Sequence, residues 1–426
     1  MKHLARVTVT GLFDSFDHSI EIVGDPEATI ISGPNGTGKT HILRLLKATF
    51  ELDLDYLTAA PFRRMMLAFK DESELAIVRN LRKGEPVGLD ITGAYPSGRT
   101  YSYTFEPIPE RDREFTILER RLLELTGEWD SEARAFSAKN PIERNRKKRY
   151  PAWLSRMAAT PTHMIETKRL HIPAAGATAR RSAGGKEPSA LETHIKQIDS
   201  QVSAAREKSL SVTQELDQTF PMRILGNRND SPNSYRRTSL SRLSAMYEEV
   251  QEIGAELHSI GLSAMPELIE IPGADVTDIE RKILTLFAQD WRRKLEPLLP
   301  IGERLSAFTS ILNGKLRGKK VNYHPTRGLE FTNIVAQEVI PVDSLSSGEQ
   351  HLLVLFASLL FSAPEGSIVL IDEPEISMHA AWKHAFLEDI TLVGRIQNLQ
   401  VILATHSTSI IRGRWDLVQE IGLKDD

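Results

Sequence analysis

Cysteine is absent from the 426-residue sequence, which excludes disulfide bridges, thiolate zinc sites and cysteine nucleophiles. The first six residues, MKHLAR, lack the apolar core of a signal peptide. The longest apolar run, residues 352–363, is interrupted by Ser358 and is too short to span a bilayer. We therefore expect a cytoplasmic protein without a membrane partner.

A large excess of either charge sign is also missing, since 53 basic residues face 57 acidic ones and the net charge is −4. This balance argues against broad electrostatic coating of nucleic acid. Two local basic clusters remain, at residues 144–149 and 315–320. Such clusters are typical of solvated surfaces. Contact with a nucleic-acid backbone or an acidic partner is the alternative.

Residues 33–40 read GPNGTGKT and fit the phosphate-binding loop pattern G-x-x-x-x-G-K-[ST]. A buried strand is predicted before the loop at 28–31 and a helix after it at 42–46, so that the helix N-terminus faces the phosphates. Lys39 is expected to reach the β- and γ-phosphates, and the Thr40 hydroxyl to bind Mg²⁺. A glycine turn that matches by chance is the alternative. The residues predicted to bind ATP here are Gly33, Asn35, Gly36, Thr37, Gly38, Lys39 and Thr40.

Two further apolar runs end in polar side chains. Residues 367–373, SIVLIDE, predict a buried parallel strand whose carboxyl end carries Asp372 and Glu373. Asp372 is expected to hold Mg²⁺ through its outer shell, and Glu373 to polarise the attacking water. Residues 401–407, VILATHS, predict a neighbouring strand that brings His406 to the γ-phosphate. A surface Asp-Glu pair and a structural histidine are the alternatives.

The N-terminal part predicts a β-layer, with strands within 4–32, a hairpin over 64–78 and a strand pair over 87–105. Residues 107–160 are polar, charged and helical in pattern. Strands are expected again at 164–167 and 170–173. Residues 174–190 are small and patternless, which is typical of a flexible linker.

The middle of the chain has a helical period. Apolar residues follow steps of four and three over 191–216 and over 243–260, with turn formers at 225–233 between them. This pattern predicts an antiparallel coiled-coil hairpin that projects about 35–40 Å, or else a helix pair folded against the body. A further helix is expected from Thr277, with Glu280 completing a capping box, to about residue 298. β-structure is expected near 321–340.

Residues 345–350, LSSGEQ, lead into an apolar helix over 351–361. A Ser-Gly turn that opens a helix is an anion site. With the motifs above, the chain resembles the ABC-type ATPases, whose signature is similar and whose heads dimerise head to tail. The resemblance implies an α/β head domain and a homodimer or higher homo-oligomer. It implies that Ser346 and Gly348 contact the γ-phosphate of another subunit, that Glu373 is the base and that His406 is the switch histidine. Ser347 and Glu349 belong to the same implied ATP-binding loop.

Within that superfamily the chain is similar to prokaryotic AAA-type ATPases of anti-phage systems, such as the PARIS (AriA) and Septu (PtuA) ATPase subunits and the ATPase halves of OLD-family nucleases. The motifs that carry this similarity are residues 165–170, 345–350, 371–379 and 404–407. The similarity covers about 1–80 and 320–415 of the chain. It implies a sensor and scaffold, triggered by nucleic acid or a phage protein, that controls a separately encoded effector.

Two departures from these families matter. No glutamine precedes Gln197, so the usual glutamine after the P-loop helix is missing. Slow turnover, or a larger role for ATP binding than for hydrolysis, is therefore expected. The sequence ends about 20 residues past His406, which leaves no room for a Toprim nuclease. We expect a Toprim-like or HNH-like nuclease, or another toxin, on a separate polypeptide.

The alternative functions are an SMC/RecF-like DNA-repair ATPase that acts directly on DNA and, less favoured by the long helical insertion, the ATP-binding subunit of a transporter. The expected domains are an N-lobe at 1–106, a helical, strand and linker segment at 107–190, a helical or coiled-coil insertion at 191–300 and a C-lobe at 301–426.

Overall fold

The computed structural model describes residues 2–23, 28–82, 84–107, 150–166, 190–226, 239–264 and 276–422. The basic cluster at 144–149, the predicted strand at 170–173, the linker at 174–189 and most of the tip at 225–233 lie outside the described residues. Contacts divide the chain into two compact units. Unit 1 comprises Met1–Thr167, Ala363–Ile376 and Lys383–Asp426, and unit 2 comprises Lys168–Ser362 and Ser377–Trp382. The predicted domain boundaries stay predictions.

Unit 1 contains a five-stranded sheet in the order β14-β3-β13-β12-β8, in which every neighbouring pair is parallel. Its two central strands are buried along their whole length, as expected for a parallel sheet with both faces covered. The strands predicted before the P-loop and at the two C-terminal motifs are thereby confirmed. The bounds are β3 Thr29–Ser32, β8 Thr162–Glu166, β12 Ile368–Asp372, β13 Gln400–Ala404 and β14 Val418–Glu420.

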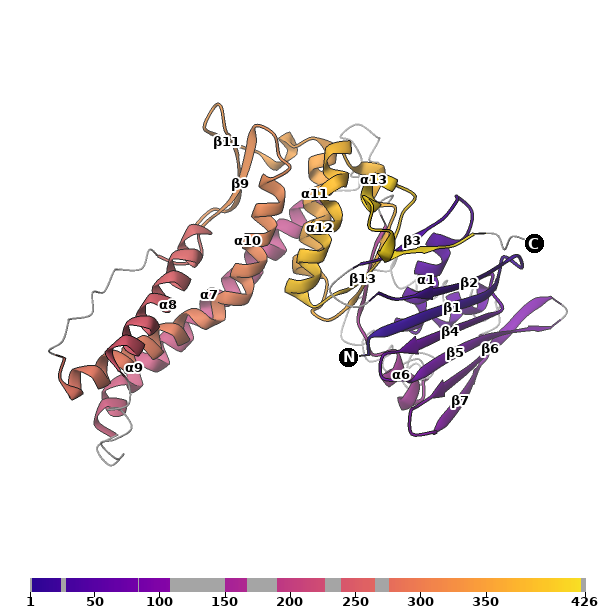
Figure 1. Cartoon of the computed structure of the whole chain (residues 1–426), viewed down its shortest axis with the longest axis horizontal. Coiled ribbons are helices and arrows are strands. Elements are labelled where there is room, and N and C mark those ends of the chain that lie inside the picture. Colours follow the sequence, from indigo (N-terminus) through magenta and orange to yellow (C-terminus); the bar gives the residue numbers. More distant parts are fainter. Residues whose placement is uncertain are drawn as a thin grey trace, which may run out of the picture. The chain divides into compact units, whose positions relative to one another are not determined.

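The predicted N-terminal β-layer is a six-stranded antiparallel sheet in the order β2-β1-β4-β5-β6-β7 (Figure 1). Its hairpins turn at residues 70–73 and 95–99, where turn-forming residues interrupt the alternating pattern. The bounds are β1 Leu4–Leu12, β2 Phe16–Glu21, β4 Arg64–Phe69, β5 Glu74–Arg82, β6 Glu85–Ala94 and β7 Thr100–Phe105.

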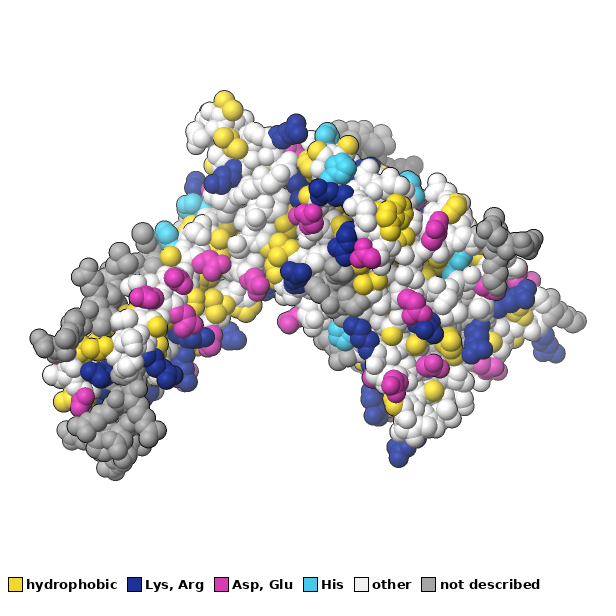
Figure 2. Space-filling model, viewed as in Figure 1, with side chains coloured by type: hydrophobic (Ala, Val, Ile, Leu, Met, Phe, Trp, Pro, Cys, Tyr) yellow, Lys and Arg dark blue, Asp and Glu magenta, His cyan; other side chains and the backbone are white. Residues whose placement is uncertain are grey.

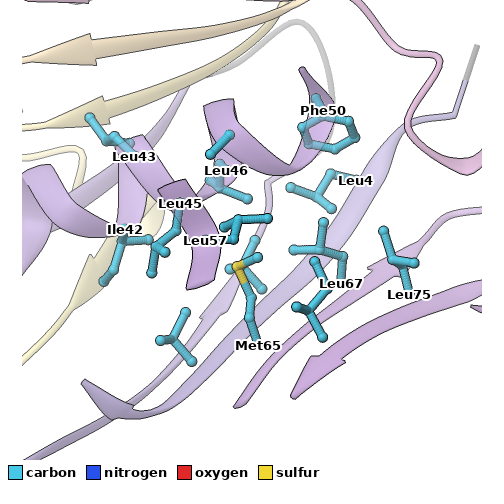
Figure 3. Close-up of a cluster of buried hydrophobic side chains, with 14 of the residues drawn as sticks. Leu4, Ile42, Leu43, Leu45, Leu46, Phe50, Leu57, Met65, Leu67 and Leu75 are labelled. Carbon is cyan, nitrogen blue, oxygen red and sulfur yellow. The ribbon is translucent and has the colours of Figure 1, made fainter. Parts of the chain in front are cut away.

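The P-loop helix α1 (Lys39–Phe50) packs its apolar side between the two sheets of unit 1. Figure 3 shows Ile42, Leu45 and Leu46 pointing into a cluster with side chains of the antiparallel sheet. Burial of this stripe holds the loop before α1 in place, since a helix anchored along its length cannot shift its N-terminus. Other short elements of unit 1 are α2 (Leu54–Ala59), α6 (Ala152–Met157), α13 (Thr408–Ile411), η5 (Pro374–Ser377) and η6 (Trp415–Leu417), and α12 (Ala380–Gln397) lies mostly in this unit.

Unit 2 holds the long helices and a three-stranded antiparallel sheet in the order β11-β10-β9. The capping box of Thr277 and Glu280 is present at the start of α9, as predicted. The bounds are α7 Ala190–Gly226, α8 Leu240–Ser259, α9 Asp278–Leu295, η2 Glu296–Leu298, α10 Leu299–Asn313, β9 Lys319–His324, β10 Gly328–Asn333, β11 Glu338–Ile340, η3 Val342–Ser344, α11 Ser347–Ala357 and η4 Ser358–Ser362.

The helical insertion differs from the predicted two-helix hairpin. Helix α9 packs against both α7 and α8, and the three run side by side in Figure 1. The apolar stripe of α8 is buried on α9: Leu243 and Tyr247 cluster with Ala288, and the Tyr247 hydroxyl donates to Leu284 O at 3.1 Å. The expected coiled-coil pair is therefore part of a three-helix arrangement, because α9 supplies an apolar face that the heptad pattern alone did not reveal.

The observed fold is of the predicted α/β class. A parallel sheet carries the P-loop, and the antiparallel layer comes from strands on both sides of the P-loop in sequence. A long helical insertion separates β8 from β12 of the parallel sheet. None of the helices that the structure describes is long and apolar enough to cross a membrane.

Candidate nucleotide site and signature loop

The phosphate-binding loop connects the end of β3 to the start of α1. Two of its glycines require the left-handed region, since Gly36 has φ +90° and Gly38 has φ +97°. At Gly33 a Cβ would lie 2.1 Å from Ile421 O, so a side chain there would collide with backbone. The sequence therefore folds into a loop whose N–H groups are available at a helix N-terminus, where an anion is stabilised.

Lys39 is buried at the start of α1. Its Nζ donates to Gly33 O at 2.7 Å and to Pro34 O at 2.9 Å. Burial lowers the pKa of the Lys39 ammonium, and the nearby Glu373 and Asp372 carboxylates partly oppose this shift. The Lys39 ammonium is thus bound by neutral loop carbonyls. An anionic phosphate would be a stronger acceptor and would take their place.

Thr40 and Asp372 meet although 332 residues separate them in sequence. The Thr40 Oγ1 lies 3.0 Å from both Asp372 carboxylate oxygens. A hydroxyl and a carboxylate side by side are hard oxygen ligands that fit Mg²⁺, which keeps waters and phosphate oxygens in its remaining positions. Among the described residues, no group of three or more His, Cys, Asp or Glu side chains is arranged to hold a metal ion.

Glu373 leaves the sheet edge in an unusual conformation, with φ +45°. Its backbone N–H donates to Ala404 O at 2.9 Å, which ties the end of β12 to the end of β13. A non-glycine residue with positive φ persists only where the surroundings hold it there, and such residues gather at functional sites. The side chain retains 19% exposure, so its carboxylate is within reach of solvent.

Sequence reasoning assigned no role to Glu375, which lies in η5 next to His406. Glu375 Oε1 accepts from Thr405 Oγ1 at 2.6 Å and from His406 N at 3.0 Å. His406 Nδ1 lies 3.2 Å from the same oxygen and 4.0 Å from Glu373 Oε1. His406 therefore lies beside the two carboxylates that follow β12 and is closer to Glu375 than to Glu373; its predicted contact with the γ-phosphate stays a prediction.

A second residue that the sequence did not reveal is His18 of β2, whose Nε2 lies 2.9 Å from Thr37 O. Burial lowers the pKa of His18, partly opposed by this backbone contact. The His18 ring thus contacts the P-loop from the antiparallel layer. Glu166 at the end of β8 is a further acid at this edge, since its Cα pairs in register with Asp372 and its carboxylate accepts from Arg44. His18 lies in no motif, whereas Glu166 lies in the motif at 165–170, to which the sequence assigned no individual role.

The signature loop opens α11 in unit 2. Ser346 is the N-cap residue: its Oγ accepts from Glu349 N at 3.4 Å, while Ser346 N donates to Glu349 Oε2 at 2.7 Å. Lys319 Nζ donates to the same carboxylate at 2.7 Å. Burial opposes ionisation of Glu349, but these hydrogen bonds outweigh it and hold its pKa below the usual value.

The predicted site residues thus form two groups. Gly33, Asn35, Gly36, Thr37, Gly38, Lys39, Thr40, Asp372, Glu373 and His406 belong to unit 1, whereas Ser346, Ser347, Gly348 and Glu349 belong to unit 2. In the signature group, Ser346 and Ser347 are exposed and Glu349 is buried. The observed role of Glu349 is to complete the cap, and its predicted contact with ATP stays a prediction.

Comparison with known proteins gives one family match. The family model described as "AAA domain, putative AbiEii toxin, Type IV TA system" matches residues 181–412, more than half of the 426 residues. No curated protein matches the sequence.

Among solved structures, the chain is similar to SMC head domains. One is the Smc head domain with an extended coiled coil bound to the C-terminal domain of ScpA, derived from Pyrococcus furiosus, at 14% identity and a TM-score of 0.37 over 100% of this chain and 94% of that chain. Another is the SMC head domain from Thermotoga maritima, at 11% identity and a TM-score of 0.32 over 96% and 91%. TM-scores of this size are too low to support an argument about function or assembly.

Proposed function

The chain belongs to this AAA-domain family. On that premise we propose that it is an ATPase in which each ATP site is formed by two copies of the chain. ATP with Mg²⁺ binds at the P-loop of one copy, and the signature loop of a second copy closes the site. In the cell the assembly acts as the sensor and scaffold of an anti-phage defence system and controls a separately encoded nuclease or toxin.

The observation that carries the ATPase proposal is the meeting of Thr40 and Asp372 at 3.0 Å beside Lys39 and Glu373. Lys39 binds the phosphates once it leaves the Gly33 and Pro34 carbonyls. Bound Mg²⁺ supplies charge neutralisation for the phosphates. Glu373 orients and polarises the attacking water, since its exposed carboxylate follows Asp372 directly.

Head-to-tail assembly is proposed from the chemistry of the signature loop. The Ser346 oxygen accepts from Glu349 N, and its O–H donates to the Glu349 carboxylate; a phosphate oxygen of another copy would take over this donor. The loop opens a helix, so its N–H groups also favour an anion. By the family resemblance, that anion is the γ-phosphate held by another copy.

The ATPase proposal is tested by two substitutions and one control. Lys39→Ala removes the phosphate-binding cation and is expected to weaken ATP binding by roughly 10- to 100-fold, the effect of one charge-assisted hydrogen bond. Glu373→Gln is expected to keep ATP binding, lower turnover by roughly 100-fold or more, and trap the closed assembly. The measurements are nucleotide titration, phosphate release and mass by light scattering.

Lys47→Ala provides the matched control, because Lys47 lies on the same helix with 40% of its side chain exposed and pairs only with Glu51 among the ion pairs of the described residues. It is expected to leave ATP binding unchanged. Hydrolysis by Glu373→Gln at the parental rate would contradict the role of Glu373 as the base.

The defence role is supported by the motifs shared with anti-phage ATPases and by the family description, which names a toxin of a toxin–antitoxin system. The test is co-expression with the products of adjacent reading frames. We expect a Toprim-like or HNH-like neighbour to co-purify with the wild-type chain, and ATP with Glu373→Gln to change the amount bound. Protection against phage by the chain without any neighbour would contradict effector control.

Direct action on DNA is the competing function, and the basic cluster at 315–320 does not favour it. Lys319 is paired with Glu349, and Lys315 is 8% exposed with its Nζ 5.9 Å from the centre of the Phe356 ring. On the face shown in Figure 2, basic and acidic side chains are interspersed over the helices α7–α9. Salt-dependent DNA binding with DNA-stimulated ATP hydrolysis would reverse this preference.

A further inference from the structure

Glu375 is a buried acid near the nucleotide site, and the proposed reaction gives it no part. Its side chain is 4% exposed, and its Oε1 accepts from Thr405 Oγ1 and His406 N, while His406 Nδ1 lies 3.2 Å from the same oxygen. The donors sit at the end of β13, whereas Glu375 follows the end of β12. The carboxylate therefore joins the two strand ends that carry the proposed base and the proposed switch histidine.

The contact at Nδ1 bears on which ring nitrogen of His406 carries the proton. A carboxylate oxygen 3.2 Å from Nδ1 favours the ring form with the hydrogen on Nδ1, which leaves Nε2 as the second, independent nitrogen. Glu373 Oε1 lies 4.0 Å from Nδ1, beyond hydrogen-bond distance. Because Glu375 takes the histidine, the Glu373 carboxylate remains available for water.

The second oxygen of Glu375 adds to this argument. Oε2 is buried and has no hydrogen-bond partner among the described residues. A buried carboxylate oxygen without a partner lowers stability. The chain thus buries this carboxylate at a greater cost than one whose two oxygens are both paired.

We propose that Glu375 is a positioning residue of the ATP site, which fixes the Nδ1–H tautomer and the orientation of His406. In this orientation Nε2 contacts the γ-phosphate, and the Glu373 carboxylate is left to polarise the attacking water. The inference rests on the proposed ATPase function. Glu375 acts as a hydrogen-bond acceptor, and it touches neither ATP nor the attacking water.

The test compares Glu375→Ala with Glu375→Gln. Loss of the acceptor in Glu375→Ala is expected to lower kcat by roughly 10- to 100-fold, as for other groups that orient a functional histidine, with a smaller change in KM for ATP. In Glu375→Gln the amide oxygen keeps an acceptor at the same position beside Thr405 and His406, so kcat is expected to recover to within a few-fold of wild type. Equal loss in both variants would overturn positioning in favour of a charge effect.

Nitrogen-15 NMR of histidine-labelled protein gives a readout that does not depend on ATP turnover. Among the 12 histidines, the His406 signals are those lost in His406→Gln. We expect a protonated Nδ1 in the wild-type chain and in Glu375→Gln, and loss of that signature in Glu375→Ala. A protonated Nδ1 that persists in Glu375→Ala would overturn the proposal. Absence of ATP hydrolysis in the wild-type chain would instead contradict the ATPase function and leave the tautomer test valid.

Asp290→Ala is the control for removing a buried acid. Asp290 and Glu375 are each 5% exposed, but Asp290 lies in unit 2, where it pairs with Arg223. We expect this variant to lower the melting temperature while it keeps the His406 signature. Glu375→Ala should alter the His406 signals at temperatures well below its own melting transition.

Discussion

The P-loop and the signature loop each place a polar turn at the start of a helix, yet they are held by contacts of different range. Thr40 of the P-loop meets Asp372 across 332 residues, and Thr37 O meets His18 from the other sheet. The signature loop is closed by Ser346 and Glu349, which are three residues apart, and by Lys319. The P-loop therefore depends on the assembled sheets, whereas the signature loop forms with its own helix.

The two loops also differ in the charge that they leave for a ligand. In the P-loop a buried ammonium is bound by neutral carbonyls, so a cation remains for phosphate. In the signature loop the carboxylate of Glu349 already accepts from the N-cap N–H and from Lys319. The signature loop therefore presents the start of a helix to a ligand rather than a free cation. It is suited to complete a phosphate site, and the P-loop is suited to bind ATP first.

Ser346→Arg tests whether the P-loop binds ATP and the signature loop completes the site. Of the variants that distinguish the two loops, it has the largest expected effect on kcat. A long cation at the turn blocks approach of a second P-loop, so kcat is expected to fall by roughly 100-fold, comparable to loss of a donor that stabilises developing charge. ATP affinity of the single copy is expected to stay near wild type. Ser239→Arg is the matched control, because Ser239 caps α8 by accepting from Arg242 N at 3.2 Å.

Mixing two inactive variants sharpens the same prediction. Lys39→Ala lacks a working P-loop and Ser346→Arg lacks a working signature. If the site is shared between copies, a mixed dimer contains one complete site, and an equal mixture recovers roughly a quarter of wild-type activity. No recovery, with mixed dimers present by mass measurement, would contradict a head-to-tail site.

The contrast in contact range explains what could be predicted from the sequence. Residues 33–40 and the strand that ends at Asp372 carry local patterns, so the loop, both strands and their shared sheet edge were predicted and the fold class is confirmed. The support of Thr37 by His18 and of His406 by Glu375 arises from tertiary packing, which leaves no spacing signal. The packing of α9 also leaves no spacing signal. Its apolar face packs against the apolar residues of α8, which the heptad pattern predicted to pair with the other arm of a two-helix hairpin.

Asp290→Ala has an intermediate expected effect, confined to stability. The Asp290 carboxylate accepts from both terminal nitrogens of Arg223, at 2.6 and 2.7 Å, and joins α9 to α7. Its removal is expected to lower the free energy of unfolding by about 1–3 kcal/mol, the range for hydrogen bonds to charged groups. Urea denaturation measures the loss, and Lys294→Ala, which breaks the more exposed pair with Asp217, should cost less. An equal loss in both variants would contradict the importance of burial for this ion pair.

His18→Gln has the smallest expected effect and concerns pH. Burial lowers the pKa of His18 in the folded chain below its ordinary value of 6.5, so the unfolded chain binds the proton more readily. Stability is therefore expected to fall as pH drops through and below 6.5, and to level off below the folded pKa. Gln keeps a donor for Thr37 O but does not titrate, so the melting temperature of the variant should fall less steeply between pH 7.5 and pH 5. Because other groups titrate alike in both proteins, the difference between the two curves reports His18, and parallel curves would contradict its neutral, buried state behind the P-loop.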